Sequence, residues 1–266
     1  MRYAALGFAL ATITWVATSR ATNHHHGAAA TQDQHWNWHG SVPAGQHIEV
    51  RGVNGSVTAT PAAGSEVEVT ADKHGRRSDP GDVQIVVVRS DAGVTICAVY
   101  PGPHNDCRPG GGQMNTHDND VTVDFAVRVP SGVGFAGYTV NGDAEADSMS
   151  GPAEVSTVNG SARVETLSGD AKAHTVNGSV TAIVHSLAGN GDLDFETVNG
   201  AVRLSMPAGL NADVDAETVN GAISTDFPIQ VQGHMTPRHL VGRIGGGGRE
   251  LKIHSVNGSV ELTRLP

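Results

Sequence analysis

The chain has 266 residues, of which 34 are glycine and only 4% are aromatic, and its formal net charge is −10 at pH 7. So few large side chains argue against a thick core and favour many short strands joined by tight turns. The acidic balance argues against nucleic-acid binding, which needs a basic surface.

The first residues have the pattern of an export signal. Met1 and Arg2 supply a positive start, residues 3–16 form an apolar run, and Ser19 and Ala21 are small residues at the −3 and −1 positions of a cleavage site. The run is shorter than the ~20 residues that a membrane-spanning helix needs. We therefore expect residues 1–21 to be a signal peptide. The mature protein is expected in the periplasm or at the cell surface, without a stable membrane span.

Residues 22–42 are polar, rich in histidine and without periodicity, which predicts a flexible linker. Neutral imidazoles bind transition metals, but a defined site needs fixed ligands with supporting hydrogen bonds. We therefore predict solvation or adventitious binding here, and no metal-ligating residue or cofactor in the chain. Trp36 and Trp38 could contact sugar or lipid headgroups, or could cover the first turn of the next domain.

From residue 43 to the C-terminus the sequence predicts one β domain. Apolar residues alternate with polar ones at period two, which is typical of strands. No segment has a helical period, so we expect almost no helix. The alternating segments before the repeats cover residues 48–53, 66–69, 83–87, 94–96 and 121–129.

Cys97 and Cys107 are the two cysteines of the chain. In an exported protein a lone pair ten positions apart most simply forms a disulfide, here closing a loop over residues 97–120. Such a bond contributes roughly 2.7 kcal/mol by the chain-entropy model. A metal site that includes His104 is the alternative, although the spacing matches no standard zinc pattern.

The tripeptide Val-Asn-Gly recurs, and its central copies are eighteen residues apart with Ser-Gly pairs midway between them. The regular repeats cover residues 138–226. This period favours a single-stranded parallel β-solenoid with about 18 residues per turn, in which like residues stack. Small inward residues such as Ala162 and Val164 suit its narrow interior. An antiparallel β-meander or sandwich with Asn-Gly hairpins is the alternative.

The Asn-Gly pairs are predicted to be a structural turn ladder. Glycine accepts positive φ and asparagine tolerates the left-handed region, so the pair suits a sharp corner. Stacked asparagine side chains can also hydrogen bond from one turn to the next, whereas binding of a sugar or metal is the alternative role. The predicted ladder residues are Asn141, Gly142, Asn159, Gly160, Asn177, Gly178, Asn199, Gly200, Asn220 and Gly221.

Several motifs together resemble the DUF4097 family of exported bacterial β-strand-repeat proteins, often labelled as adhesins. They are the recurrent T-V-N-G and L-S-G, the ICAVYP run with its later Cys107, and DVTVDFAVRVPSGV before the first regular repeat. The resemblance covers roughly Val50 to the C-terminus. It implies a parallel β-solenoid, and it carries no catalytic residues over to this chain.

Carboxylates such as Asp194 and Glu196 are spread over the outward positions without an obvious focus, and no catalytic motif occurs. We therefore expect an exported, non-enzymatic adhesin-like or scaffold module of the cell envelope, whose partner is a glycan or a protein. One alternative is a carbohydrate-active enzyme on a pectate-lyase-like coil, which would need acidic residues brought together from distant parts of the chain. The other is metal binding by the histidine-rich arm. A localised function is expected on the charged outward positions or in loops that break the period.

Overall fold

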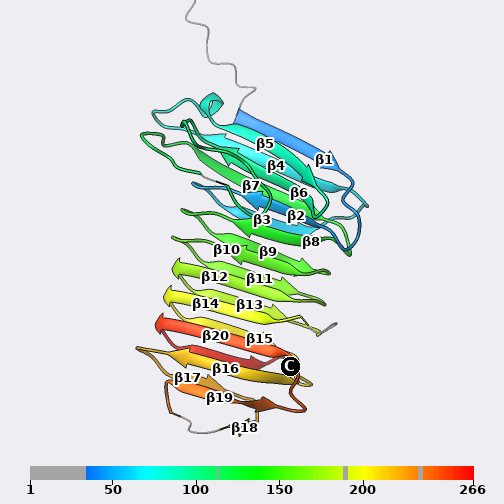
Figure 1. The fold of residues 1–266 in the computed structure, drawn as a ribbon, viewed down its shortest axis with the longest axis vertical. Helices are drawn as coiled ribbons and strands as arrows, with labels where there is room; N and C mark the ends of the chain where they lie inside the picture. The colour runs from blue at the N-terminus through cyan, green and yellow to red at the C-terminus, as the bar shows by residue number, and fades with distance from the viewer. Residues whose placement is uncertain (1–33, 113, 188–190, 233–235) are drawn as a thin grey trace, which may run out of the picture. The chain divides into compact units, whose positions relative to one another are not determined.

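Two β-sheets contain nearly all the regular structure of the computed structural model, which describes residues 34–112, 114–187, 191–232 and 236–266 (Figure 1). Helical structure among these residues is limited to 3-10 turns such as Pro80–Asp82. The predicted all-β class is therefore confirmed. The predicted signal peptide, and the linker as far as residue 33, lie outside the described residues.

The sheets contain ten and eleven strands. In spatial order the ten-stranded sheet consists of β1 (His35–Gly40), β4 (Val67–His74), β7 (Thr122–Val129), β3 (Val57–Pro61), β9 (Ala144–Met149), β11 (Ala162–Thr166), β13 (Val180–Val184), β15 (Val202–Met206), β21 (Val260–Arg264) and β17 (Ile223–Thr225). The eleven-stranded sheet consists of β18 (Ile229–Val231), β19 (His239–Ile244), β16 (Ala212–Thr218), β20 (Glu250–Asn257), β14 (Leu193–Asn199), β12 (Ala171–Asn177), β10 (Ala153–Ser156), β8 (Gly134–Tyr138), β2 (His47–Arg51), β6 (Gly93–Val99) and β5 (Gln84–Ser90).

The central strands alternate between the two sheets along the chain, and each pairs in parallel with its equivalent one repeat later. Ala153 of β10 lies opposite Ala171 of β12, and Ala162 of β11 lies opposite Val180 of β13, which are both steps of eighteen residues. We call two such consecutive strands, one from each sheet, a strand pair.

The flanking strands do not follow this pattern, so both sheets are mixed. Antiparallel pairing joins β1 to β4, β4 to β7, β5 to β6, β16 to β19 and β18 to β19. The two residues that link β5 to β6 are too few for a crossover, so these strands must form a hairpin. A purely parallel coil is thus not confirmed.

Spatial order also departs from chain order at both ends of the regular region. The last strand pair, β20 and β21, lies between the pair β14–β15 and the pair β16–β17 (Figure 1). In the same way β2 lies between β6 and β8, and β3 lies between β7 and β9. At both ends of the regular region, a strand pair therefore lies between strands that are distant from it in sequence.

The core lies between the sheets and consists mainly of small or β-branched side chains. Residues predicted to point inward, such as Ala144, Ala162, Val164 and Val180, are fully buried. Larger side chains, among them Phe125, Phe195 and Leu251, fill the interior towards the flanking strands. Because the inward positions of the central repeats are small, the buried layer there is thin.

Every Val-Asn-Gly motif contributes its asparagine to one continuous row of side chains. In six of the seven asparagines Nδ2 donates to Oδ1 of the neighbouring asparagine at 2.8 Å, and Asn54 at the end of the row only accepts from its neighbour. This asparagine ladder joins the turns of seven strand pairs, and all its amides point the same way. Its spatial order is Asn54, Asn141, Asn159, Asn177, Asn199, Asn257 and Asn220.

The threonine of T-V-N-G has a matching role beneath the ladder. Oγ1 of Thr157 donates to the carbonyl oxygen of Gly142 at 2.7 Å, and Oγ1 of Thr175 donates to that of Gly160 at 2.8 Å. These threonines are buried, with 3–5% exposure, so the bonds satisfy hydroxyl groups that water does not reach. Each turn is thus fixed to its neighbour twice.

The glycines of these turns are needed for a reason that the sequence analysis did not give. At Gly178 and Gly200 a Cβ atom would lie well within 3.0 Å of the carbonyl oxygen of the neighbouring glycine, a separation that real Cβ atoms do not show. In the described residues positive φ outside glycine occurs at Asp118 and Ser148, and so at no asparagine of the ladder. The ladder asparagines therefore do not adopt the left-handed conformation that they tolerate. Positive φ in these turns falls on glycines such as Gly55, whose φ is 114°.

The flexible-linker prediction is wrong for residues 35–40, which form the edge strand β1. Trp36 and Trp38 pack against the core, and Nδ1 of His35 lies 2.6 Å from Oδ1 of Asp72. The sequence HWNWHG alternates at period two, and its tryptophans supply the apolar face that a strand needs.

The loop after β6 is clipped by the predicted disulfide, which joins Cys97 to Cys107 with their Cα atoms 5.7 Å apart. Tyr100 follows the strand and is buried, and its Oη donates to the carbonyl oxygen of Val121 at 2.9 Å. Burial raises the pKa of Tyr100 to about 12. The same Val121 carbonyl accepts from Nδ2 of Asn54, so Tyr100 supports the first asparagine of the ladder.

We expect Asn159→Asp to destabilise the protein more than Asn159→Ala. Alanine removes two ladder hydrogen bonds, at a cost of about 1–2 kcal/mol. Aspartate also places a carboxylate oxygen against Oδ1 of Asn141, which has no hydrogen to donate there. Urea unfolding measures the difference, and an aspartate variant as stable as the wild type would contradict the ladder's role.

A chain that ends at Gly248 is expected to lose more than its last two strands. Without β20 and β21, both β14 and β16 lose their shared neighbour, so their backbone amides become an open edge. Hydrogen exchange in residues 193–206 should quicken at least ~10-fold. Deletion of residues 35–40 is the control, because β1 pairs with β4 alone, and unchanged exchange in residues 193–206 after the C-terminal truncation would contradict the prediction.

Stability should fall as the pH rises from 10 towards 12, because unfolded tyrosine loses its proton near pH 10 while folded Tyr100 keeps it to about 12. The stabilisation is fully present below pH 10, and its loss amounts to at most about 3 kcal/mol. Tyr100→Phe should cost about 1 kcal/mol at pH 7 through its lost hydrogen bond and should flatten this alkaline dependence. Guanidinium unfolding at pH 8 and pH 11 tests both, and an equally steep loss in the phenylalanine variant would rule Tyr100 out as its source.

Candidate functional site

On the outward face of the eleven-stranded sheet, side chains at equivalent positions form straight rows that cross the strands. Parallel pairing in register aligns equivalent positions, and side chains alternate between the two faces of each strand. The residue before each Thr-Val-Asn-Gly or Ser-Val-Asn-Gly therefore faces outward next to its equivalent on the neighbouring strand. Four such residues and His239, which lies opposite Glu217 on the antiparallel strand β19, form what we call the histidine–glutamate row: His174, Glu196, His254, Glu217 and His239.

A second row lies two residues earlier on the same strands. It alternates in charge, and we call it the lysine–aspartate row: Glu154, Lys172, Asp194, Lys252 and Asp215. Two residues after the histidine–glutamate row follow exposed valines, each 37–46% accessible, which we call the valine row: Val158, Val176, Val198 and Val219. Three rows of different chemistry thus run side by side across the strands.

A shallow groove of about 280 Å³ lies between the valine row and the histidine–glutamate row. Its lining includes Val158, Val176, Val198, His174, Glu196 and His254. One side of the groove is therefore apolar and the other is polar.

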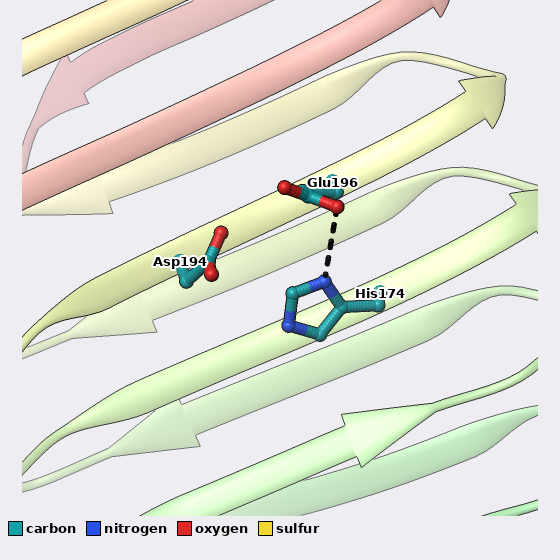
Figure 2. A group of neighbouring side chains, drawn as sticks. All are labelled: His174, Asp194 and Glu196. Carbon is teal, nitrogen blue, oxygen red and sulfur yellow. Dashed lines mark ion pairs between the residues drawn. The ribbon is translucent and has the colours of Figure 1, made fainter.

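The tightest group of ligand-type side chains on this face is His174, Asp194 and Glu196. His174 lies on β12, and both carboxylates lie on the adjacent strand β14 (Figure 2). One ligand atom from each residue lies within 4.8 Å of the others, and Nδ1 of His174 is 3.7 Å from Oε2 of Glu196. The group combines one imidazole with two carboxylates, which is a set that can hold a cation.

Asp194 is the most constrained member of this group. Its Oδ1 has almost no accessible surface and accepts no hydrogen bond from the described residues. Burial raises the pKa of the Asp194 carboxyl, while His174 and the two neighbouring lysines act against this increase. Lys252 instead pairs with Glu250 at 3.2 Å, and that contact raises the pKa of Lys252.

A second concave site lies beside the disulfide-clipped loop. This cavity of about 330 Å³ is lined in part by Glu49, Gly110, Tyr138, Glu154 and Lys172. It exists because β2 inserts next to β8 and because the loop folds back over the sheet, where Gly110 N–H donates to Oε2 of Glu49 at 2.9 Å. Carboxylates from distant parts of the sequence therefore meet here.

The polar groups of this cavity are bound to one another. Oη of Tyr138 donates to Oε1 of Glu154 at 2.7 Å, and the guanidinium of Arg51 lies over the Tyr138 ring at 4.2 Å. Burial raises the pKa of Tyr138 above its ordinary value, so this hydroxyl stays a donor. Glu49 is nearly inaccessible and is held by Arg51, Thr95 and Gly110.

Of the residues that the sequence analysis singled out, the cysteines form the disulfide and the Asn-Gly pairs lie in the stacked turns. His24, His25 and His26 lie outside the described residues. His35 and His39 lie on β1 and face Asp72 and Glu66. The sequence predicts no metal ligands on the sheets, and it does not predict that His174, Asp194 and Glu196 lie close together.

A signal for the histidine–glutamate row is nevertheless present in the sequence. Aligning the repeats on Val-Asn-Gly puts His174, Glu196, Glu217 and His254 at one position. Their spatial order depends on the insertion of β20 between β14 and β16, which the alignment does not show.

No helix among the described residues is long and apolar enough to cross a membrane. No curated protein matches the chain in sequence.

Among solved structures, a proposed cell adhesion protein from Clostridium sporogenes ATCC 15579 is similar, with a TM-score of 0.51 and 10% identity, over 87% of this chain and 100% of that one. This similarity concerns the fold alone. Proposed adhesins from Bacteroides fragilis NCTC 9343 (TM-score 0.23, 11% identity, 87% and 97% covered) and Parabacteroides merdae ATCC 43184 (0.22, 8%, 88% and 97%) are more distant.

A family model matches the part of the chain that contains the regular Thr-Val-Asn-Gly repeats. The model that matches is Toastrack DUF4097, over residues 137–263. This range contains the stacked T-V-N-G turns from Asn141 to Asn257 and the three outward rows. Residues 137–263 of this chain are therefore similar to the Toastrack DUF4097 family.

Proposed function

We propose that the chain is an exported, non-enzymatic adhesin-like or scaffold module of the bacterial cell envelope, which binds a glycan or protein partner along the outward face of the eleven-stranded sheet. The observation that carries the proposal is the set of three parallel rows on that face. A partner with a repeating structure can contact equivalent side chains at each strand, at steps of about 4.8 Å.

The contribution of these charged and histidine side chains to folding stability is too small to explain their arrangement in rows. In the pairs His174–Glu196, His254–Glu217 and His239–Asp215, the nearest imidazole nitrogen and carboxylate oxygen are 3.7–3.9 Å apart, and most of these side chains are exposed. Exposed pairs of this kind contribute 0–1 kcal/mol. Charge alternation along a face is better suited to partner selection, since complementary charges favour the right partner and repel others.

The valine row supports the same reading. Four valines 37–46% exposed form a stripe beside the charged rows. An apolar stripe bordered by polar groups is typical of contact surfaces.

Export is supported by the sequence and by the disulfide. Residues 1–21 have the pattern of a signal peptide. The disulfide Cys97–Cys107 suits an oxidising compartment such as the periplasm or the cell exterior.

The cavity beside the disulfide loop is the place to look for the alternative, a carbohydrate-active enzyme. Glycoside hydrolysis needs a pair of carboxylates free to exchange protons with the substrate. Glu49 is buried and holds the loop through the Gly110 N–H, and Glu154 accepts from Tyr138. These contacts favour a structural role for Glu49 and support binding over hydrolysis.

Charge reversal on the proposed face tests the function. We expect Lys172→Glu/Lys252→Glu to weaken binding of the purified protein to a glycan array or to cell-envelope protein fractions at least tenfold, because it breaks the charge alternation. The measurement is made in EDTA so that metal binding does not contribute. Arg128→Glu/Arg203→Glu is the matched control, because it changes the net charge equally on the ten-stranded sheet and should alter binding less than twofold.

Two results would overturn the proposal. One is an equal loss of binding in both charge-reversal variants, which would indicate a net-charge effect without a specific face. The other is hydrolase or lyase activity on a polysaccharide that Glu154→Gln abolishes, which would establish the enzyme instead.

A further inference from the structure

We propose that His174, Asp194 and Glu196 form a binding site for a divalent first-row transition-metal cation on the outward face of the eleven-stranded sheet. This site is separate from the histidine-rich arm near the N-terminus and goes beyond the partner-binding role proposed above. It follows from three features of the cluster: its geometry, its unsatisfied oxygen and its donor types.

The geometry is set by two adjacent parallel strands. Asp194 and Glu196 are two residues apart on β14, so both face outward, and His174 lies directly opposite Glu196 on β12 (Figure 2). Ligand atoms around a tetrahedral zinc with bonds of ~2.1 Å are about 3.4 Å apart. The 3.7 Å between His174 Nδ1 and Glu196 Oε2 is close to that value. The limit of 4.8 Å for the whole group is longer, so the side chains would have to move towards one another to bind the metal.

Asp194 gives an independent reason to expect a ligand. Its Oδ1 is shielded from water and accepts no hydrogen bond from the described residues. A buried carboxylate oxygen without a partner is costly, and a bound cation would remove that cost. The two lysines opposite Asp194 do not act as partners of its carboxylate. Neither forms an ion pair with Asp194 in the described residues, and Lys252 pairs with Glu250 instead.

The donor types select the class of metal. An imidazole nitrogen suits zinc, copper, nickel, cobalt and iron, whereas magnesium and calcium take oxygen ligands. Two carboxylates and one neutral imidazole offset the charge of a divalent ion. The three residues supply fewer ligands than a four-coordinate metal takes, and a further histidine, His254, lies directly opposite Glu196 on β20.

The positive charges of the flanking lysines repel a cation, so the proposal predicts in which direction metal affinity changes when one of them is removed. Lys172 lies directly opposite Asp194 on the neighbouring strand, and its positive charge acts on the Asp194 carboxyl. Its removal should strengthen metal binding, whereas a purely structural role of the cluster predicts no such gain. The gain should shrink at high salt, because the charges at this face are partly exposed.

The experiment uses the full chain with His24, His25 and His26 replaced by alanine, so that the arm does not contribute. Binding of Zn²⁺, Ni²⁺, Mg²⁺ and Ca²⁺ is measured by isothermal titration calorimetry at pH 7.5. We expect one Zn²⁺ or Ni²⁺ per chain, with affinity lowered at least tenfold by His174→Ala and by Asp194→Asn. Lys172→Ala should raise the affinity severalfold, and Mg²⁺ and Ca²⁺ should bind at least tenfold more weakly than Zn²⁺.

His239→Ala is the matched control, because His239 lies on the same row and faces Asp215 at 3.7 Å but belongs to no three-residue cluster. It should leave the affinity unchanged. Circular dichroism checks folding, and Glu196→Gln replaces Asp194→Asn if the latter does not fold. The proposal is overturned if the chain with these three alanine substitutions binds no transition metal, if His174→Ala and His239→Ala have equal effects, or if Ca²⁺ binds as tightly as Zn²⁺.

Discussion

The close contact between glycines of neighbouring turns is the constraint on which the rest of the structure depends. A Cβ at Gly178 or Gly200 would collide with the carbonyl oxygen of the glycine in the adjacent turn. Only this approach brings the asparagine amides to 2.8 Å of each other and lets the threonine hydroxyls reach the glycine carbonyls. The register of every central strand follows from it, and with the register the alignment of the outward rows.

Insertion of distant segments lets the same contact act between parts of the chain that are far apart in sequence. Asn257 accepts from Asn220 and donates to Asn199, and Asn54 accepts from Asn141. The Val-Asn-Gly motifs nearest the two ends of the chain therefore join the ladder beside copies that are distant in sequence. Long-range pairing of this kind ties the ends of the domain to its middle, so strands from both ends share one cooperative structure.

The outward face owes its chemistry to that register. A shift of one residue in β14 would turn Asp194 and Glu196 inward and separate them from His174. The same alignment puts charged, histidine-containing and apolar rows side by side over several strands. The proposed partner binding along the face and the proposed metal site at one point on it therefore both depend on this stacking pattern, and His174, Asp194 and Glu196 belong to both.

The sequence by itself determined the all-β class, the disulfide and the spacing of the stacked turns, because alternation, cysteine count and an eighteen-residue period are local or periodic signals. The sequence also contains the period-two alternation of HWNWHG in β1, but the polar composition of this segment led to the prediction of a linker. Only the tertiary structure decided that β20 lies between β14 and β16, that flanking strands pair antiparallel, and that His174 meets Asp194 and Glu196. These depend on which strand edges remain open when the chain returns, and no sequence period encodes that.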